Sequence, residues 1–486
     1  MGAIGIQCMA SLLLAVLLFK AGIAIVWPSY ALRMLEDTDS PIGYIIKKDE
    51  ANLIGSMLML GSLVACIFVG YISEQIGRKR TELLSGLAFI LAWSILTTAK
   101  SAIQIVIARF ILGIAGGTQL VIGYIFVAEI SQTSVRGTLM SVLTFAFNLG
   151  NLISYIEGWT CSYEMINYIN LSLAVVITLL LSLLKESPVY LVRHGKEKEA
   201  LNSLKFYRGA KTVTQEILDE LDYIRNLQQA SSSPDTSVPN DDSALEKIKL
   251  NNDENDQVTE KNLRPNPWKL LLATKSLQRM IITLTLVSVL SIFMGMMAVL
   301  TYAGQLFKRA APDISPDMCS VVMASILAVA GAISVVITDL VPRRALMIVT
   351  CAGAAVCMAL LSSMLRWSWA PEWGIPLMII SFSVCFQIGP ANVPFVQVAE
   401  CIPSQIKSLG SPIVIGSMIS SNFIILYLFG PAVTVLGLDG VFCLSSITST
   451  LAVIVTYLFM RETKKEPIEN IQLMFEQGYI YRRRKI

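Results

Sequence analysis

Long apolar runs separated by short polar connections dominate the chain. Leu53–Ile72 and Leu83–Thr98 flank the polar stretch Gly70–Arg80, and each is close to the ~20 residues with which a helix crosses a bilayer core. Because the connection is so short, the two helices are expected to be antiparallel neighbours. Its last three residues, Arg78–Arg80, are all cations, which predicts that this connection lies on the cytoplasmic side.

The same pattern recurs and predicts twelve transmembrane helices, six on each side of a long polar segment. The first six spans are expected at Ile4–Trp27, Leu53–Ile72, Leu83–Thr98, Ile103–Val127, Leu139–Ser154 and Met165–Leu184. The second six are expected at Met280–Tyr302, Val321–Ile337, Leu346–Leu365, Ile375–Val398, Pro412–Phe429 and Val441–Met460. The fold class is therefore an all-α membrane protein, and the even number of spans places both termini in the cytoplasm.

The polar segments divide the chain into four parts. We expect a six-helix half at 1–184, a cytoplasmic segment at 185–276, a second half at 277–460 and a cytoplasmic tail at 461–486. Apolar residues of the segment, such as Ala200, Leu201 and Leu204, recur with helical spacing and predict amphipathic helices. Its middle, Ser231–Asp256, is polar and nearly free of aromatic residues, which predicts disorder.

Composition supports a membrane protein and argues against an enzyme. Of the 486 residues, 54% are hydrophobic and only 15% are charged, a balance that soluble domains do not show. The single His makes His-based metal sites and catalytic triads unexpected, and no nucleophile with a base and an orienting residue is apparent. The nine Cys show no paired spacing that indicates a disulfide framework. We therefore expect no cofactor, no metal and no nucleic-acid partner; the expected partners are a small solute and the bilayer.

The polar connections repeat between the halves. Val127-Ala128-Glu129 precedes Arg136 as Val398-Ala399-Glu400 precedes Lys407. The other matching pairs are Gly77-Arg78-Lys79 with Pro342-Arg343-Arg344, and Glu186-Ser187-Pro188 with Glu462-Thr463-Lys464. Three matches in the same order, at equivalent places, predict two related six-helix halves.

At these residues the chain resembles the sugar-porter branch of the major facilitator superfamily, and the insect trehalose and glucose facilitators within it most of all. The resemblance covers nearly the whole chain. Lys185, Pro342 and Arg461 replace a Pro, a Gly and a Pro of the family motifs. It implies facilitative transport of a small polar solute, most simply trehalose or a hexose, by alternating access, with a site near the midplane between the halves.

The resemblance also implies a charge cluster at the inner face that gates transport. Its expected members are Glu74, Gly77, Arg78, Arg109, Glu129, Arg136 and Glu186, repeated by Asp339, Arg343, Arg344, Glu400, Lys407 and Glu462. Such clusters latch the halves together when the inner side is shut. The alternative is plain positive-inside anchoring with solvated ion pairs. We favour the latch, because carboxylates add nothing to topology.

The sugar-contacting positions depart from the family pattern. The seventh span reads Ser291–Met297 where typical members carry two Gln and an Asn, and Leu327 and Met418 fall on other family Asn positions. The substrate-binding residues expected here are Thr144, Asn148, Gln387, Phe395 and Asn422, with Lys20 at the edge. Breaks at Gly389-Pro390 and Pro394 are expected to open the tenth span toward this site.

Two features of the first span bear on mechanism. Lys20 lies about 16 residues into it, so its ammonium either faces the central cavity or reaches the outer headgroups along its flexible stem. Proton-coupled relatives carry a carboxylate in this span, at the position of Gly22 here, whereas no acidic residue occurs between Met1 and Leu35. This absence favours facilitated diffusion over proton-coupled transport. The expected location is the plasma membrane. The alternatives are a non-transporting nutrient sensor and a transporter of another organic solute.

Overall fold

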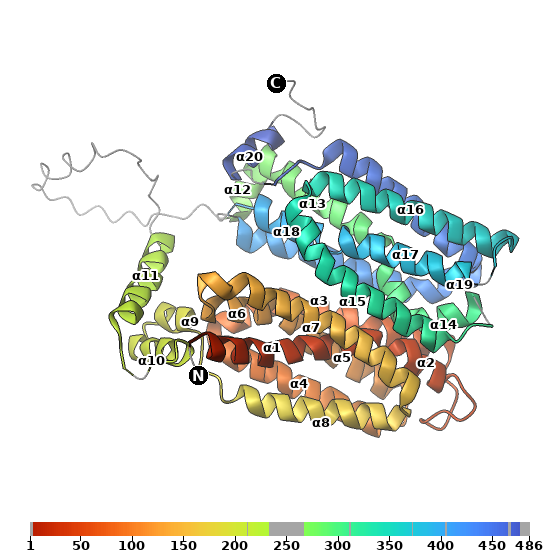
Figure 1. The fold of residues 1–486 in the computed structure, drawn as a ribbon, viewed down its shortest axis with the longest axis horizontal. Helices are drawn as coiled ribbons and strands as arrows, with labels where there is room; N and C mark the ends of the chain where they lie inside the picture. Colours follow the sequence, from red (N-terminus) through yellow and green to blue (C-terminus); the bar gives the residue numbers. More distant parts are fainter. Residues whose placement is uncertain are drawn as a thin grey trace, which may run out of the picture.

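The protein is a bundle of long helices in two halves that lie side by side (Figure 1). The computed structural model describes residues 3–210, 212–232, 267–310, 313–371, 373–403, 406–464 and 468–476, and these contain helices and no strands. Eleven helical stretches in the described part are long and apolar enough to cross a membrane. The expected all-α membrane fold is confirmed.

The first half contains six spans, some of them built from more than one helix. The elements are α1 (Ala3–Val26), α2 (Pro28–Leu35), α3 (Lys48–Ile76), α4 (Arg78–Thr98), α5 (Ala102–Thr118), the π-helical turn η1 (Gln119–Gly123), α6 (Tyr124–Ile130), α7 (Thr133–Thr160) and α8 (Tyr163–Leu181). Gly allows α3 and α5 to pack closely, since a Cβ on Gly113 would lie 2.0 Å from the carbonyl oxygen of Leu58.

The second half repeats this arrangement. Its elements are α13 (Lys275–Phe293), α14 (Met296–Ala310), α15 (Pro316–Leu340), α16 (Arg343–Trp367), α17 (Gly374–Ile388), α18 (Val393–Cys401) and α19 (Lys407–Phe459). The short helices α12 (Pro267–Ala273) and α20 (Ile468–Glu476) lie beside the start of α13 (Figure 1). The break between α17 and α18, at Gly389-Pro390, is the one expected in the tenth span.

The last two predicted spans are parts of one helical stretch, α19, which is interrupted at Gly437 with φ 75° and ψ 170°. Gly410, near its start, lies against Ile281 at the beginning of α13. Tyr457, near its end, accepts a hydrogen bond from Arg344 at the beginning of α16. Both ends of α19 therefore lie at the same end of the bundle, and the chain reverses near Gly437. The eleven stretches thus contain the twelve predicted spans.

Several spans are longer than the apolar pattern predicts. The third span begins at Arg78 and not at Leu83, so that Glu82 is inside it. The reason is that helical hydrogen bonding continues through polar residues at a helix end, whereas a hydropathy pattern stops at the first charge. This shift of one turn matters, because Glu82 is 1% exposed in the structure.

Three helices follow the first half, α9 (Pro188–Arg193), α10 (Glu197–Tyr207) and α11 (Gln215–Ser232). Tyr190, Leu204 and Leu221 share a small apolar core among them. The Tyr207 hydroxyl donates to the carbonyl of Lys185, and burial raises the pKa of Tyr207, which keeps it a donor. Residues 233–256 of the expected disordered middle, and the tail cations Arg482–Lys485, lie outside the described residues.

Helices of the two halves meet along two long contacts. α3 packs on α19, and α7 packs on α15. Glycine permits the approach at both, because a Cβ on Gly430 would lie 2.0 Å from the Asn52 side chain and one on Gly331 would lie 3.1 Å from that of Asn148. These contacts position the polar residues of α7, α15 and α17 at the interface between the halves.

Candidate functional site

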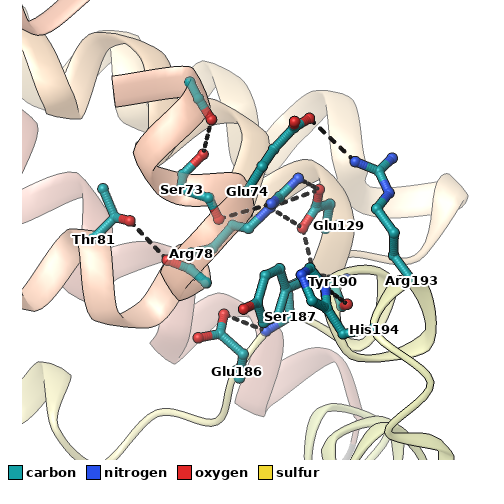
Figure 2. Close-up of polar contacts among 12 residues, drawn as sticks. Ser73, Glu74, Arg78, Thr81, Glu129, Glu186, Ser187, Tyr190, Arg193 and His194 are labelled. Carbon is teal, nitrogen blue, oxygen red and sulfur yellow. Dashed lines mark hydrogen bonds and ion pairs between the residues drawn. The ribbon is translucent and has the colours of Figure 1, made fainter. Parts of the chain in front are cut away.

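An ion-pair network joins the α3–α4 connection to α6 and α9 at one end of the first half (Figure 2). Arg78 Nε donates to both carboxylate oxygens of Glu129, at 3.2 and 3.1 Å, and its Nη1 donates to the Ser73 carbonyl at 3.0 Å. The Ser187 hydroxyl also donates to Glu129. The side chains of Arg78 and Glu129 are only 6% and 13% exposed. The pair is therefore shielded from solvent, which strengthens it over a surface pair.

Glu186 caps the first turn of α4. Its carboxylate accepts from the backbone N–H of Lys79 at 2.9 Å, and a negative charge is favourable at this helix end. Gly77 makes the approach possible: its φ is 102°, and a Cβ there would lie 2.3 Å from Glu186 Oε2. Glycine is required at this position both by the backbone conformation and by space.

The second half contains the same network, residue for residue. Arg343 pairs with Glu400 at 3.2 Å and donates to the Thr338 carbonyl, and Thr463 donates to Glu400. Glu462 accepts from the backbone N–H groups of Arg343 and Arg344, at 2.9 and 3.1 Å. The spacing repeat in the sequence thus corresponds to a repeated three-dimensional arrangement. We call the end of the bundle that carries both networks the motif end.

Each network joins helices of its own half in this structure. Arg78 and Glu129 belong to the first half and Glu186 to the segment that directly follows it, while their counterparts Arg343 and Glu400 belong to the second half and Glu462 to the tail that directly follows that half. A latch between the halves, formed when the motif end closes, therefore stays a prediction. Of the remaining expected members, Glu74 forms an exposed pair with Arg193 at 3.2 Å, and Arg136 donates to the Ser131 carbonyl at 3.3 Å. The side chains of Asp339 and Lys407 lie outside the described part.

Arg109 is not a member of the motif-end network, which corrects the sequence expectation. It lies two turns into α5, at 1% exposure, and its Nε donates to the Ile54 carbonyl at 3.0 Å. Its Nη1 donates to the Ala24 carbonyl, and its guanidinium lies 5.7 Å from the centre of the Trp27 ring. The α5 helix starts at the opposite end of the bundle, so a position early in it is far from Arg78.

The Lys20 ammonium lies at neither of the two places predicted for it, the central cavity and the outer headgroups. It is fully buried between α1, α4 and α8, and its ammonium donates to the backbone and side-chain oxygens of Asn170 at 2.6 and 2.8 Å. The ammonium lies 4.6 Å from the centre of the Trp93 ring. Asn170 in turn donates to Glu157 at 3.0 Å. Lys20 is therefore held inside the first half and reaches neither the interface between halves nor the lipid headgroups.

Two expected substrate-binding residues meet at the interface of the halves. Asn148 in α7 and Gln387 in α17 both approach Gly331 in α15, with amide nitrogens 3.1 and 3.3 Å from the position of a Cβ on that glycine. Thr144, one turn before Asn148, bonds the Tyr124 hydroxyl at 2.9 Å. Sequence spacing placed Thr144 and Asn148 on one helix face, and the structure agrees.

The other expected residues lie on different helices of the second half. Phe395 in α18 is 49% exposed, and Asn422 in α19 is 8% exposed with its Oδ1 lacking a hydrogen-bond partner. Asn392, which was not among the expected residues, donates to the Gln387 carbonyl at 3.0 Å and to Ser334. Its signal was present, because Asn392 lies within the expected helix break.

Polar contacts between the halves, among the described residues, are concentrated at the end of the bundle opposite the motif end. Arg33 pairs with Asp317, and Gln305 donates to both oxygens of Glu36 at 3.1 Å. The Gly304 backbone N–H donates to the Ser29 hydroxyl at 2.8 Å. These bonds link α2 and the loop after it to α14 and α15, so this end is closed in the structure.

We predict that Asp317→Asn loosens this closed end. Arg33 and Asp317 have side chains 21% and 27% exposed, so losing the pair is expected to cost about 1 kcal/mol. A cysteine introduced at Ser29, which is 1% exposed, should then react about three to ten times faster with a water-soluble maleimide. Asp313→Asn is the matched control in the preceding loop. Equal rates in parent, control and variant would show that the pair does not hold this end.

The comparisons with known proteins agree with this architecture. The chain matches the family described as "Sugar (and other) transporter" over residues 32–475. The chain belongs to this family, which consists of membrane transporters and not enzymes.

Relatives and solved structures give the same picture. A facilitated trehalose transporter Tret1-2 homolog of Drosophila sechellia is 23% identical over 476 residues, covering 96% of this chain and 90% of that protein. The facilitated trehalose transporter Tret1 of Drosophila yakuba is 24% identical, and the match covers 51% of its length. The inward-open xylose transporter XylE from E. coli superimposes with a TM-score of 0.75 at 16% identity, covering 95% of this chain and 98% of XylE. The fold is thus that of the major facilitator transporters.

Proposed function

We propose that the protein is a facilitative transporter that carries a small polar solute, most simply trehalose or a hexose, across the membrane by alternating access. The observation that carries the proposal is the duplicated Arg–Glu network, one copy in each half at the same end of the bundle. Each network makes its half a rigid unit, and rocking of two rigid units about a central site is how such folds transport. Family membership and the names of the trehalose-transporting relatives support the solute class.

The proposed solute site lies where α7, α15 and α17 meet. Asn148 and Gln387 supply amide groups beside Gly331, and Thr144 supplies a hydroxyl one turn away. Phe395 offers a ring for stacking on a sugar, and Asn422 has a free acceptor oxygen. Apolar residues replace amides elsewhere on the proposed wall, namely at Ile292, Met297, Leu327 and Met418. We therefore expect weaker glucose binding than a wall rich in amides provides.

Charge distribution supports a sidedness for the protein. The motif end carries Arg78–Arg80 and Arg343-Arg344 in short connections, and such connections remain on the cytoplasmic side. With this orientation α9–α11 and both termini lie in the cytoplasm, and the closed end faces outward at the plasma membrane. The parts 1–184, 185–276, 277–460 and 461–486 then correspond to half, cytoplasmic segment, half and tail.

Two other functions are separable by experiment. A non-transporting nutrient sensor would bind a sugar on the same scaffold without moving it. A transporter of another organic solute would move something other than a sugar. The intact networks in both halves favour transport over sensing, because a sensor needs no repeated switching of the two ends.

Flux measurement in sealed proteoliposomes tests the proposal. We expect labelled trehalose or glucose to equilibrate down its gradient, at a rate unaffected by an imposed pH gradient. Sugar binding without flux would support the sensor, and accumulation driven by protons would contradict facilitated diffusion. If the protein moves no sugar but moves another solute from a competition panel, it is a transporter of that other class of solute.

The same assay tests the site when the sugar affinity is taken from the dependence of flux on sugar concentration. Asn148→Ala and Gln387→Ala are each expected to weaken sugar binding about tenfold, since each removes hydrogen bonds of about 0.5–1.5 kcal/mol to a solute with several hydroxyls. Gln215→Ala, on the exposed face of α11, is the control and should leave flux unchanged. Unchanged sugar affinity in both interface variants would place the site elsewhere.

A further inference from the structure

A carboxyl group that the transport proposal does not use is buried inside the first half. Glu82, in α4, is 1% exposed, and Gln119, at the start of the π-helical turn η1, is 0% exposed. Gln119 Nε2 donates to Glu82 Oε2 and, at 2.8 Å, to the Ser85 hydroxyl. Extra-wide helical turns of this kind often occur at functional sites, and here the turn directs Gln119 toward α4.

Two oxygen atoms of this pair have no hydrogen-bond donor. Both Glu82 Oε1 and Gln119 Oε1 are buried and unpartnered. Both lie beside Gly123, since a Cβ on Gly123 would lie 3.9 Å from the first oxygen and 3.4 Å from the second, and the apolar Leu18 side chain, 3.1 Å from the same position, offers them no donor. An unpaired buried acceptor costs about 1–3 kcal/mol, and an unpaired buried charge costs more. Two such acceptors on one hydrogen-bonded pair of side chains therefore favour the binding of a donor that both can use.

A single proton on Glu82 Oε1 satisfies both atoms. The protonated carboxyl donates from Oε1 to Gln119 Oε1, while its Oε2 keeps the bond from Gln119 Nε2. Acid and amide then share two parallel hydrogen bonds. A metal cation fits less well, because hard cations take about six or more oxygen ligands, and Glu82 Oε2 and the Ser85 hydroxyl are already engaged.

We propose that Glu82 and Gln119 form a proton-binding site inside the first half, and that the bound proton joins α4 to η1. The proton comes from the pool of hydronium ions in the solvent, and Glu82 changes from a carboxylate to a neutral acid when it binds. Because Glu82 lies one helical turn after Arg78, the site also connects the motif-end network to the interior of the half. The proton stays bound throughout the transport cycle and is not carried across the membrane with the solute.

The charged groups on the elements around α4 have partners other than Glu82. Lys20 of α1 bonds Asn170, Glu74 of α3 pairs with Arg193, and Arg109 of α5 bonds backbone carbonyls. On α4 itself, Arg78 pairs with Glu129 and Lys79 donates to the Ser182 carbonyl. The remaining charges of these elements lie at helix ends, namely Lys48, Asp49 and Glu50 of α3, Arg80 of α4 and Glu164 of α8. Within the described part, then, no cation forms an ion pair with Glu82 that would hold it as a carboxylate.

Infrared spectroscopy of the purified full chain tests the proposal directly. We expect the parent at neutral pH to show the carbonyl stretching band of a hydrogen-bonded, protonated carboxylic acid, and this band should be lost in Glu82→Gln. Gln119→Leu should shift the band, because the acid loses its amide partner. Exposed acidic residues contribute only carboxylate bands at this pH. Glu157→Gln is the matched control and should retain the band assigned to Glu82.

Thermal unfolding in detergent provides a second readout. Glu82→Gln keeps an amide N–H in place of the acid O–H, and should unfold near the parent at neutral pH. From the acidic range in which an exposed glutamate titrates, up to the pH at which folded Glu82 loses its proton, the stability of the parent should fall with rising pH relative to that of Glu82→Gln. The reason is that the unfolded parent releases the proton that the folded parent keeps. If the parent spectrum instead shows Glu82 as a carboxylate at neutral pH, or if its carboxylate bands move when sodium is added, the proton site is wrong.

Discussion

Replacing Glu129 with glutamine is expected to slow solute flux at least about tenfold, the equivalent of ~1.4 kcal/mol. The change removes the charge opposite Arg78, whose side chain is only 6% exposed. Breaking a buried pair from one side costs on the order of 3–5 kcal/mol, because the remaining charge loses its compensation. Arg78 then holds α4 less firmly against α6 and α9, and the first half no longer moves as one body.

The second-half counterpart provides a graded comparison. Glu400, with a side chain 27% exposed, is more accessible than Glu129 at 13%, so Glu400→Gln should slow flux less. Glu400→Gln should also favour the form open at the motif end, seen as faster labelling of cysteines at that mouth. Glu74→Gln is the control, since its pair with Arg193 is about half exposed and such pairs contribute ~0–1 kcal/mol.

A failure of folding is separated from a failure of transport by measuring the thermal midpoint of each variant in detergent. We expect Glu129→Gln to remain folded, because Gln can still accept a hydrogen bond from Arg78. Normal flux in both Glu129→Gln and Glu400→Gln, with unchanged labelling, would mean that these networks only anchor the topology.

The second large effect is expected at Lys20. Lys20→Met removes the only buried cation beside Asn170 in the described part and leaves both oxygens of Asn170 that it bonded without that donor. It also leaves the Glu157 carboxylate, bonded by Asn170 at 3.0 Å, without a nearby positive charge. We expect a loss of about 2–4 kcal/mol in stability, seen as a clear drop in the thermal midpoint.

A double-mutant cycle identifies the cause. Glu157→Gln together with Lys20→Met should recover part of the loss, with a coupling of about 1–3 kcal/mol, because both charges are then removed together. Sugar affinity should be the same in all folded variants, since Lys20 is fully buried away from the interface of the halves. If Lys20→Met changes the sugar affinity without changing the stability, Lys20 is part of the solute site.

The sequence alone determined the class of the protein and the paired arginines and glutamates of its motif-end networks. Apolar runs of bilayer length specify spans wherever the chain is inserted, because backbone groups in lipid must be satisfied by helical hydrogen bonds. The repeated Arg and Glu spacing predicted both networks, since each motif lies at a helix end and equivalent helix ends meet in related halves. The break at Gly389-Pro390 was equally local, because Pro lacks the N–H that a helix needs.

The surroundings of the buried charges were decided only by the tertiary structure. Lys20, Glu82 and Arg109 each lie in an apolar run or at its margin, and no local pattern tells which helix face meets lipid and which meets a neighbour. Their partners are Asn170, Gln119 and the carbonyls of Ile54 and Ala24, which come from other helices, 37 to 150 residues away in the sequence. The rotation of each helix about its own axis follows from packing against all of its neighbours at once, and this rotation selects the group that each buried charge contacts.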